Sequence, residues 1–251
     1  MAIKAALLDV DGTIVDTEPR NRRAIEDVAA IGGHIIYPQD WNYLAGNGDS
    51  IIWDKISEQT PRLKDVFNTA SSFETACMNA KLLRINEVNV IPETKEAIEL
   101  LKQTGIGIAA VSNSITGDAG ASLTAAGFSL TETFNFCLFR DELRDLGLQA
   151  KPSPDPYNHA RKVMEQKIQA SSANENKDPL LASECLVFED SKTGVRAGLA
   201  AGMNVIHLTD ESGPMNQAEV TKALAEKPGA TYHPVTRREL VATCKKLMSL
   251  G

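Results

Sequence analysis

Two carboxylates separated by one residue, Asp9 and Asp11, stand directly after a short apolar run near the start of the chain. The run, Ala5 to Leu8, has no polar alternation, which is typical of a β-strand buried on both faces. Gly12 follows and allows the backbone to turn tightly. Ligands of open α/β sheets bind beyond the carboxyl ends of parallel strands, so this acidic pair is placed to bind a metal ion or to transfer protons. A turn with two solvated aspartates is the simpler alternative.

The Asp-x-Asp spacing also opens the calcium loop of EF-hand proteins. That loop needs glycine at its sixth position and glutamate at its twelfth. Counted from Asp9, these positions hold Ile14 and Arg20. The sequence therefore excludes a calcium loop of this kind.

Three further groups of polar residues stand near the predicted strand ends. Ser112 follows the second apolar run, Lys151 precedes a proline-rich turn, and Glu189 and Asp190 follow the fourth apolar run. Taken singly, each has an ordinary explanation as a helix cap, a solvated lysine or an acidic surface turn. Because parallel strands end at one edge of a sheet, we expect all of these residues to converge with the first acidic pair.

The converging residue types favour phosphoryl chemistry. Carboxylates gathered in one cleft repel one another unless a cation lies among them. Oxygen ligands with open positions suit Mg²⁺. Ser112 and Lys151 are suited to hold a phosphate dianion, which the cation would shield from an attacking carboxylate. The sequence therefore predicts a Mg²⁺ site next to a phosphate site.

Strands and helices alternate along the sequence, which is typical of a doubly wound parallel sheet. Strands are predicted at 5–8, 106–111, 134–139, 185–188 and 205–208, and helices at 19–30, 50–58, 67–83, 92–104, 157–166 and 191–201, with another ending at 126 and a last one following a capping box at 236–239. The first crossover is anomalous, because roughly ninety residues replace the usual dozen or so. We therefore predict a Rossmann-like α/β core, residues 1–16 and 89–251, with a helical cap domain inserted at 17–88.

Composition limits the classes of function. The chain has 251 residues, a formal net charge of -7, 43% apolar residues and four widely spaced cysteines, Cys77, Cys137, Cys185 and Cys244. The acidic balance disfavours nucleic-acid binding. Apolar runs are too short to span a bilayer, and a strand so close to Met1 leaves no room for a secretory signal, so we expect a cytoplasmic protein without a membrane partner. No cysteine pair has metal or redox spacing, and Cys185 is predicted to lie in the core.

On these motifs the chain resembles the haloacid dehalogenase superfamily over nearly its whole length. Asp9 to Thr13 resembles the first motif of that family, Ser112-Asn113 the second, Lys151-Pro152 the third and Glu189-Asp190 the fourth. The segment from Asp190 to Met203 and the inserted helical region look like the branch that contains β-phosphoglucomutase and sugar-phosphate phosphatases.

The resemblance implies a role for each matching residue. Asp9 would be the nucleophile that forms an aspartyl-phosphate, and Asp11 the general acid and then the general base. Mg²⁺ would bind the Asp9 carboxylate, the Asp11 backbone carbonyl and Asp190, with Glu189 bound directly or through water. The phosphoryl oxygens would be held by Thr13, Ser112, Asn113 and Lys151.

The resemblance also separates the candidate reactions. Dehalogenases of the family lack the second aspartate, so Asp11 favours a leaving group that needs a proton. We expect a phosphatase for a small phosphorylated metabolite, a sugar or polyol phosphate. The alternative is a mutase of the β-phosphoglucomutase type, which uses a basic cap residue, whereas the corresponding loop here, residues 45–49, has no Arg or Lys. We expect Arg20 and Lys81, which could compensate, to be solvated helix charges.

Three further features bear on function. Glu18, Arg20 and Asn47 are candidate substrate contacts, although a polar cap surface explains them equally well. A binding or regulatory protein that has lost catalysis would show a substitution in one of the four motifs, and none is present. The polar stretch 169–183 is longer than the loops of about 2–6 residues usual between helix and strand, so we expect a mobile surface loop rather than a partner site.

Overall fold

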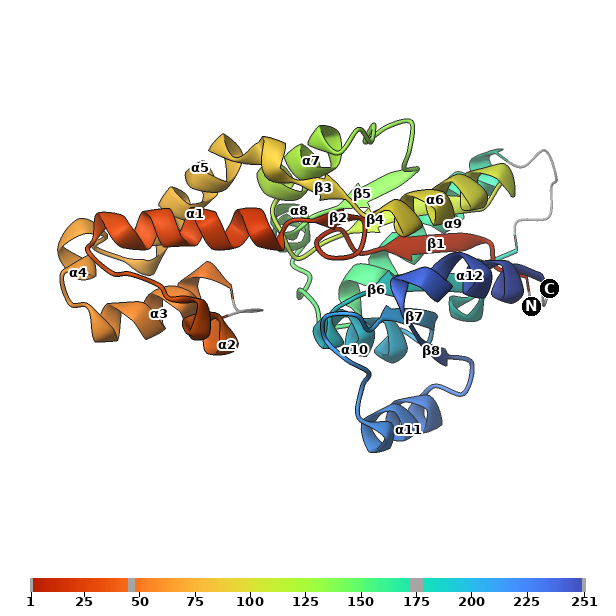
Figure 1. Cartoon of the computed structure of the whole chain (residues 1–251). Coiled ribbons are helices and arrows are strands. Elements are labelled where there is room, and N and C mark those ends of the chain that lie inside the picture. The colour runs from red at the N-terminus through yellow and green to blue at the C-terminus, as the bar shows by residue number, and fades with distance from the viewer. Residues whose placement is uncertain (1, 45–47, 172–177, 250–251) are drawn as a thin grey trace. The chain divides into compact units, whose positions relative to one another are not determined.

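A six-stranded sheet forms the centre of the core domain in the computed structural model of the protein (Figure 1). The structure describes residues 2–44, 48–171 and 178–249. The strand order is β5-β4-β1-β6-β7-β8, and every neighbouring pair is parallel. The predicted doubly wound parallel sheet is therefore confirmed.

The elements divide between two compact units, Met1–Asp16 with Asn89–Gly251, and Thr17–Val88. The core strands are β1 (Ala5–Leu8), β4 (Gly107–Val111), β5 (Phe136–Leu138), β6 (Cys185–Glu189), β7 (Asn204–Leu208) and β8 (Thr231–Val235). The core helices are α6 (Pro92–Gln103), α7 (Thr116–Ala125), α8 (Arg140–Asp145), α9 (Asp155–Ser171), α10 (Lys192–Ala200), α11 (Gln217–Glu226) and α12 (Leu240–Ser249). A short antiparallel pair, β2 (Val15–Asp16) and β3 (Asn89–Val90), stands at the two ends of the insertion.

Strand β1 lies between β4 and β6, and all four of its residues are fully buried. Its apolar run suits this place, because a central parallel strand is covered on both faces. Leu8 lies opposite Ala110 of β4 and Phe188 of β6. The residue after Leu8 is therefore brought level with the carboxyl ends of two neighbouring strands.

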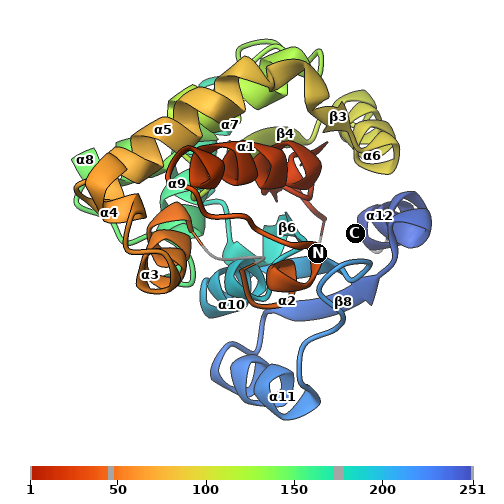
Figure 2. The same cartoon turned by 60° about the vertical axis from the view of Figure 1, so that its left-hand side comes forward.

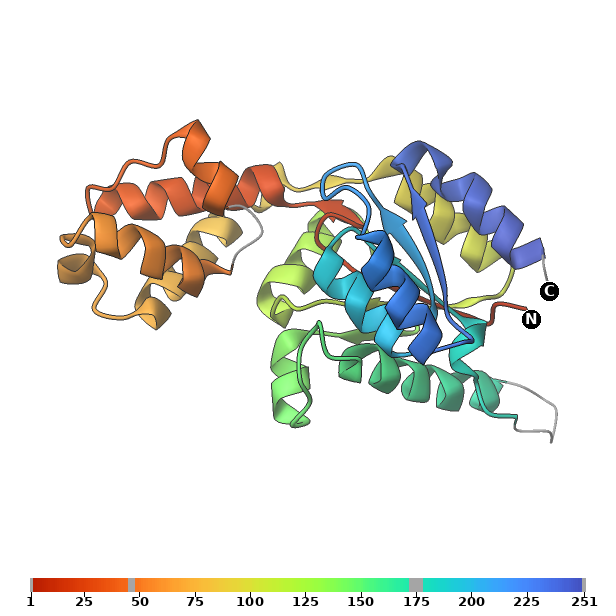
Figure 3. The ribbon, with the colours of Figure 1, turned by 90° about the horizontal axis from the view of Figure 1, so that it is seen from below.

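Helices cover both faces of this sheet. Figure 3 shows α6 and α12 next to each other on one side, where they also contact each other, and α9, α10 and α11 on the other. The second face buries apolar side chains of β1, β4, β6 and β7 against α9 and α10, including Leu7, Val187 and Met164. Cys185, predicted to lie in the core, is fully buried at the start of β6.

Some core elements differ from the sequence predictions. Strand β8 and helices α8 and α11 are additional to those predicted. The predicted loop 169–183 is partly wrong, because α9 continues to Ser171 and a 3₁₀ turn occupies Ala182–Glu184. Its middle, residues 172–177, lies outside the described residues. No helix in the described part of the chain is long and apolar enough to cross a membrane.

The described residues of the unit Thr17–Val88 form helices joined by loops, with no strand among them. It contains α1 (Glu18–Ile31), α2 (Trp41–Leu44), α3 (Asp49–Gln59), α4 (Leu63–Val66) and α5 (Ala70–Leu83). Figure 2 shows α1 and α5 side by side, and they pack against each other. Trp53, Phe67 and Phe73 form an aromatic cluster with ring centroids 5.5–6.3 Å apart, which gives this unit a core of its own.

Candidate active site

The end of β1 presents the first acidic pair at the carboxyl edge of the sheet. Asp9 is 8% exposed, and its backbone N–H donates to the Phe188 carbonyl of β6. Gly12 has a φ of 79°, and a Cβ at this position would lie 2.1 Å from Oδ2 of Asp190. Glycine is therefore required here for two reasons: the left-handed backbone and the close approach of the Asp190 carboxylate.

Lys151 joins the ends of three strands through one ammonium group. Its Nζ donates to Oδ1 of Asp9 at 2.6 Å, to Oε1 of Glu189 at 2.6 Å and to the Val111 carbonyl at 2.8 Å. The side chain is buried, so the alternative of a solvated lysine is wrong. Burial alone would lower the pKa of Lys151, but the charges of Asp9 and Glu189 outweigh it and raise that pKa.

Glu189 is fully buried and held by three side chains. Its Oε1 accepts from Lys151 and from the Tyr157 hydroxyl at 2.5 Å, and its Oε2 accepts from the Ser191 hydroxyl at 3.0 Å. A Cβ on Gly194 would come within 1.8 Å of this carboxylate, so α10 can begin here only with glycine at that position. The Tyr157 ring also lies 5.0 Å from Nζ of Lys151. Burial, followed by the charge of Glu189, raises the pKa of the Tyr157 hydroxyl.

Three carboxylates form a group that could hold a metal ion. One oxygen from each of Asp9, Glu189 and Asp190 lies within 4.8 Å of the others. Burial and then repulsion by Glu189 raise the pKa of Asp9 well above its usual value and that of Asp190 to about 7. The Lys151 ammonium is bonded to two of these carboxylates, those of Asp9 and Glu189. An oxygen-only donor set with excess negative charge fits Mg²⁺.

The pKa of Asp190 predicts how the metal-free protein responds to pH. Because the folded-state pKa is raised above the unfolded value of 3.8, the folded state holds a proton that the unfolded chain has lost. We therefore expect this residue to make the free energy of unfolding decrease as the pH rises from about 4 to about 7. Urea unfolding in EDTA, compared with Asp190→Asn across this range, measures the contribution. A difference between the two proteins that is flat or increases with pH would contradict it.

Asp11 points to the serines that follow β4. Its Oδ2 accepts from the Ser112 hydroxyl at 3.2 Å and from the Ser114 hydroxyl at 2.8 Å. The Ser114 backbone N–H in turn donates to the Ser112 hydroxyl oxygen at 2.9 Å. The Asp11 carboxylate lies outside the group of three metal-capable carboxylates. Two hydroxyl groups thus orient the Asp11 carboxylate.

The second predicted motif has an unexpected partner. The Asn113 amide donates to the Lys151 carbonyl at 3.1 Å and its oxygen accepts from the Lys151 backbone N–H at 3.0 Å. Its side chain therefore fixes the loop that carries Lys151. Thr13, in the loop after β1, is also a predicted phosphate contact. Its hydroxyl lies 3.4 Å from Oδ1 of Asp190.

The candidate cap contacts have different environments. Glu18 is exposed and pairs with Arg22 at 2.8 Å, and Asn47 lies outside the described residues. The expectation that Arg20 and Lys81 are solvated is wrong, because both are buried. Arg20 donates to the Asn21 side chain, and Lys81 donates to Oδ2 of Asp49 at 2.7 Å. An ion pair within the helical unit therefore neutralises Lys81.

Sequence reasoning did not assign Tyr157, Ser114, Ser191 or Gly194 to the site. Ser191 carries a local signal, because it caps α10 by accepting from the Gly194 N–H at 3.0 Å. Tyr157 carries none, since its partner Glu189 is thirty-two positions away. The residues predicted from the four motifs do come together: Asp9, Asp11, Thr13, Ser112, Lys151, Glu189 and Asp190 are linked by the contacts above.

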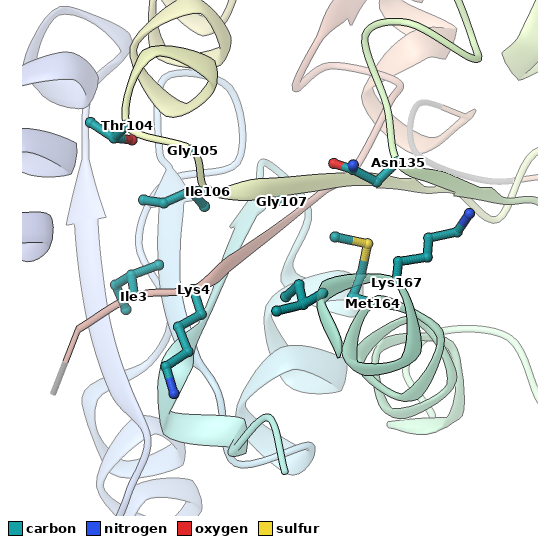
Figure 4. A pocket seen from close by; sticks show the side chains of 10 residues that line it. Ile3, Lys4, Thr104, Gly105, Ile106, Gly107, Asn135, Met164 and Lys167 are labelled. Carbon is teal, nitrogen blue, oxygen red and sulfur yellow. The ribbon is translucent and has the colours of Figure 1, made fainter. Parts of the chain in front are cut away.

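A cavity of about 290 Å³ lies away from these groups, at the amino ends of β1 and β4 (Figure 4). Lys4, Gly107, Met164 and Lys167 are among its lining residues, which include no carboxylate. Lys4 pairs with Glu184 at 2.7 Å. The cavity therefore offers no reacting group comparable with those at the carboxyl edge.

Comparisons with known proteins identify the family. A family model of haloacid dehalogenase-like hydrolases matches residues 3–202. The chain is 26% identical over 212 residues to Protein CbbY of Rhodobacter capsulatus, covering 82% of this chain and 85% of that protein. It is 26% identical over 218 residues to Hexitol phosphatase A of Escherichia coli (strain K12), covering 82% and 83%. The fold matches that of a putative β-phosphoglucomutase from Thermotoga maritima with a TM-score of 0.66 at 23% identity, covering 97% and 99% of the two chains. The chain belongs to the haloacid dehalogenase-like hydrolases.

Proposed function

We propose that this protein is a Mg²⁺-dependent phosphatase that hydrolyses a sugar or polyol phosphate through an aspartyl-phosphate on Asp9. The observation that carries the proposal is the position of the Asp9 carboxylate, 2.6 Å from the Lys151 ammonium and within the group of three carboxylates. An attacking carboxylate there has positive charge beside it to stabilise a phosphoryl group. The similarity to a hexitol phosphatase supports a small polyol or sugar as the esterified part.

The proposed reaction has two steps. An Asp9 oxygen attacks phosphorus and the ester bond breaks, while Asp11 gives a proton to the departing alkoxide. Water, deprotonated by Asp11, then attacks phosphorus and breaks its bond to Asp9, which releases inorganic phosphate, restores the Asp9 carboxylate and leaves Asp11 protonated for the next cycle. Ser112 and Ser114, bonded to Asp11 in this structure, orient its carboxylate. Lys151 neutralises charge on the phosphoryl group throughout.

The bound cation would supply charge neutralisation between the attacking carboxylate and the phosphate dianion. Asp9 and Asp190 would hold it, with the Asp11 carbonyl and with Glu189 either directly or through water. The side chain of Glu189 has more freedom at Oε2, because Oε1 already accepts two hydrogen bonds.

Removing divalent metal should abolish turnover. Without a cation the carboxylates repel the phosphate dianion, so we expect phosphate release to stop in excess EDTA and to return with Mg²⁺. Ca²⁺ should support turnover poorly, because its larger and looser coordination misplaces the attacking group. The measurement is inorganic phosphate release from a panel of sugar and polyol phosphates. Full turnover in metal-free buffer would refute this assignment.

The mutase alternative can be separated by its product. A mutase must hold a second phosphate of its intermediate, for which Arg or Lys is needed. In the helical unit Lys81 is paired with Asp49, which weakens it as such a group. We therefore expect β-glucose 1-phosphate with a bisphosphate primer to give inorganic phosphate in phosphorus NMR. Accumulation of glucose 6-phosphate without phosphate release would favour the mutase.

A further inference from the structure

A chain of hydrogen bonds runs behind Asp190 from β8 through β7 to the end of β6. The Met215 backbone N–H donates to the Tyr232 hydroxyl oxygen at 2.9 Å, and this oxygen lies 2.8 Å from Nδ1 of His207. Nε2 of His207 lies 2.9 Å from the Ser212 hydroxyl, which donates to the Asp190 carbonyl at 2.6 Å. Nε2 also lies 3.2 Å from that same carbonyl. We call this the Tyr232–His207–Ser212 chain.

The partners determine where each proton lies. The Tyr232 oxygen already accepts from Met215, so its own proton is available for Nδ1 of His207. A neutral imidazole that accepts at Nδ1 carries its proton on Nε2 and donates toward Ser212 and the Asp190 carbonyl. The Ser212 proton then goes to that carbonyl at 2.6 Å. The opposite direction would leave the carbonyl without a donor, so the first arrangement is the one in which every group is satisfied.

The chain connects three separate elements to one peptide group. His207 is fully buried on β7, opposite Glu189 of β6, while Ser212 follows β7 and Tyr232 lies on β8. The carbonyl that they hold belongs to Asp190, whose carboxylate is one of the three that could bind a cation. Fixing this peptide fixes the Cα from which that carboxylate projects.

We propose that the Tyr232–His207–Ser212 chain positions Asp190 for the cation. None of the three side chains touches the reacting atoms, so they are positioning residues that act through the Asp190 backbone. The inference rests on the proposed function for its cation. Groups that orient metal ligands from behind typically change metal affinity by about 10–100-fold when removed.

Two conservative variants test the chain. Ser212→Ala removes the direct donor to the Asp190 carbonyl, and Tyr232→Phe removes the proton that fixes the His207 tautomer. The matched control is Thr231→Val, next to Tyr232 on β8. It removes the hydroxyl that lies 2.7 Å from Asn204 of β7 and 2.7 Å from His233, without touching the chain. Mg²⁺ binding to each purified, metal-free protein is measured by calorimetry and by the rise in melting temperature, and phosphate release is followed against Mg²⁺ concentration.

We expect the dissociation constant for Mg²⁺ to rise about 10-fold or more in Ser212→Ala. In Tyr232→Phe it should rise by a smaller factor, and in Thr231→Val it should not change. The rate at saturating Mg²⁺ should stay close to that of the unchanged protein, since the reacting groups are intact. A dissociation constant within about two-fold of the original in both chain variants, or an equal loss in Thr231→Val, would overturn the inference while leaving the proposed function standing. If the protein without substitutions bound no Mg²⁺, both the inference and the proposed function would be refuted.

Discussion

Asp9→Asn should lower kcat by at least about 10⁴-fold, because an amide oxygen cannot form the covalent phosphoryl intermediate. Asparagine has nearly the same shape, and its oxygen can still accept from Lys151, which lies 2.6 Å from Oδ1 of Asp9. We therefore expect the variant to fold and to keep its affinity for inorganic phosphate. The measurement is phosphate release in saturating Mg²⁺, with melting temperature recorded on the same preparation.

Asp11→Asn is the matched control for this prediction. It leaves the nucleophile in place and removes the proton donor that Ser112 and Ser114 hold. We expect it to slow hydrolysis of alkyl phosphates strongly and that of p-nitrophenyl phosphate much less, because a good leaving group needs little protonation. Asp9→Asn should be inactive toward both. Hydrolysis by Asp9→Asn at more than about one per cent of the original rate would exclude Asp9 as the nucleophile.

Lys151→Met should damage both catalysis and folding. Loss of one preorganised charge at a phosphoryl group typically costs about 10²–10³-fold in kcat. The same change leaves Asp9 and Glu189 buried without their counter-charge, and breaking a buried pair of this kind costs about 3–5 kcal/mol of stability. Substitution of Lys151, unlike that of a surface lysine, should therefore lower both the catalytic rate and the free energy of unfolding.

The pH dependence of this variant follows from its carboxylates. The pKa of Asp9 is already raised by burial and by Glu189, and without Lys151 it should rise further. A raised folded-state pKa gives stability that is lost as the pH rises, so urea unfolding should show the largest deficit at high pH and partial recovery near pH 5. The control is Lys4→Met, which breaks the more exposed pair with Glu184 and should cost about 0–1 kcal/mol. Equal losses in the two variants would contradict the prediction.

The sequence determined the parts of the molecule whose signals are local. The apolar run of β1 ends in Asp9 and Asp11 wherever the strand is placed, and the register with β4 and β6 then brings Ser112 and Glu189 to the same edge. The capping box that begins at Thr236 is formed, with the Thr236 N–H bonded to Glu239. Hydrophobic period, capping residues and the shared direction of parallel strands suffice for these features, because each depends on neighbouring residues or on a general rule of parallel sheets.

Strand β8 shows where local signals fail. Its sequence is Thr-Tyr-His-Pro-Val, which contains a proline, Pro234. Within this strand only the last side chain, Val235, is both apolar and buried. A proline within a run argues against a central strand, and an edge strand needs no continuous apolar pattern. This segment is a strand because it pairs with β7, and that pairing is a tertiary contact that the local sequence does not specify.

Only the tertiary structure decided which polar groups share a proton or a charge. Arg20 and Lys81 look like exposed helix charges in the sequence, yet both are buried, and Lys81 pairs with Asp49 thirty-two positions away. The Tyr157 hydroxyl contacts Glu189, and the His207 ring contacts the Asp190 carbonyl, again between residues far apart in the sequence. A buried polar group must find a partner, but its type and spacing do not say which one, because the partner is chosen by the packing of distant elements. The residue types that carry the chemistry were thus determined by the sequence, and the contacts that orient them by the fold.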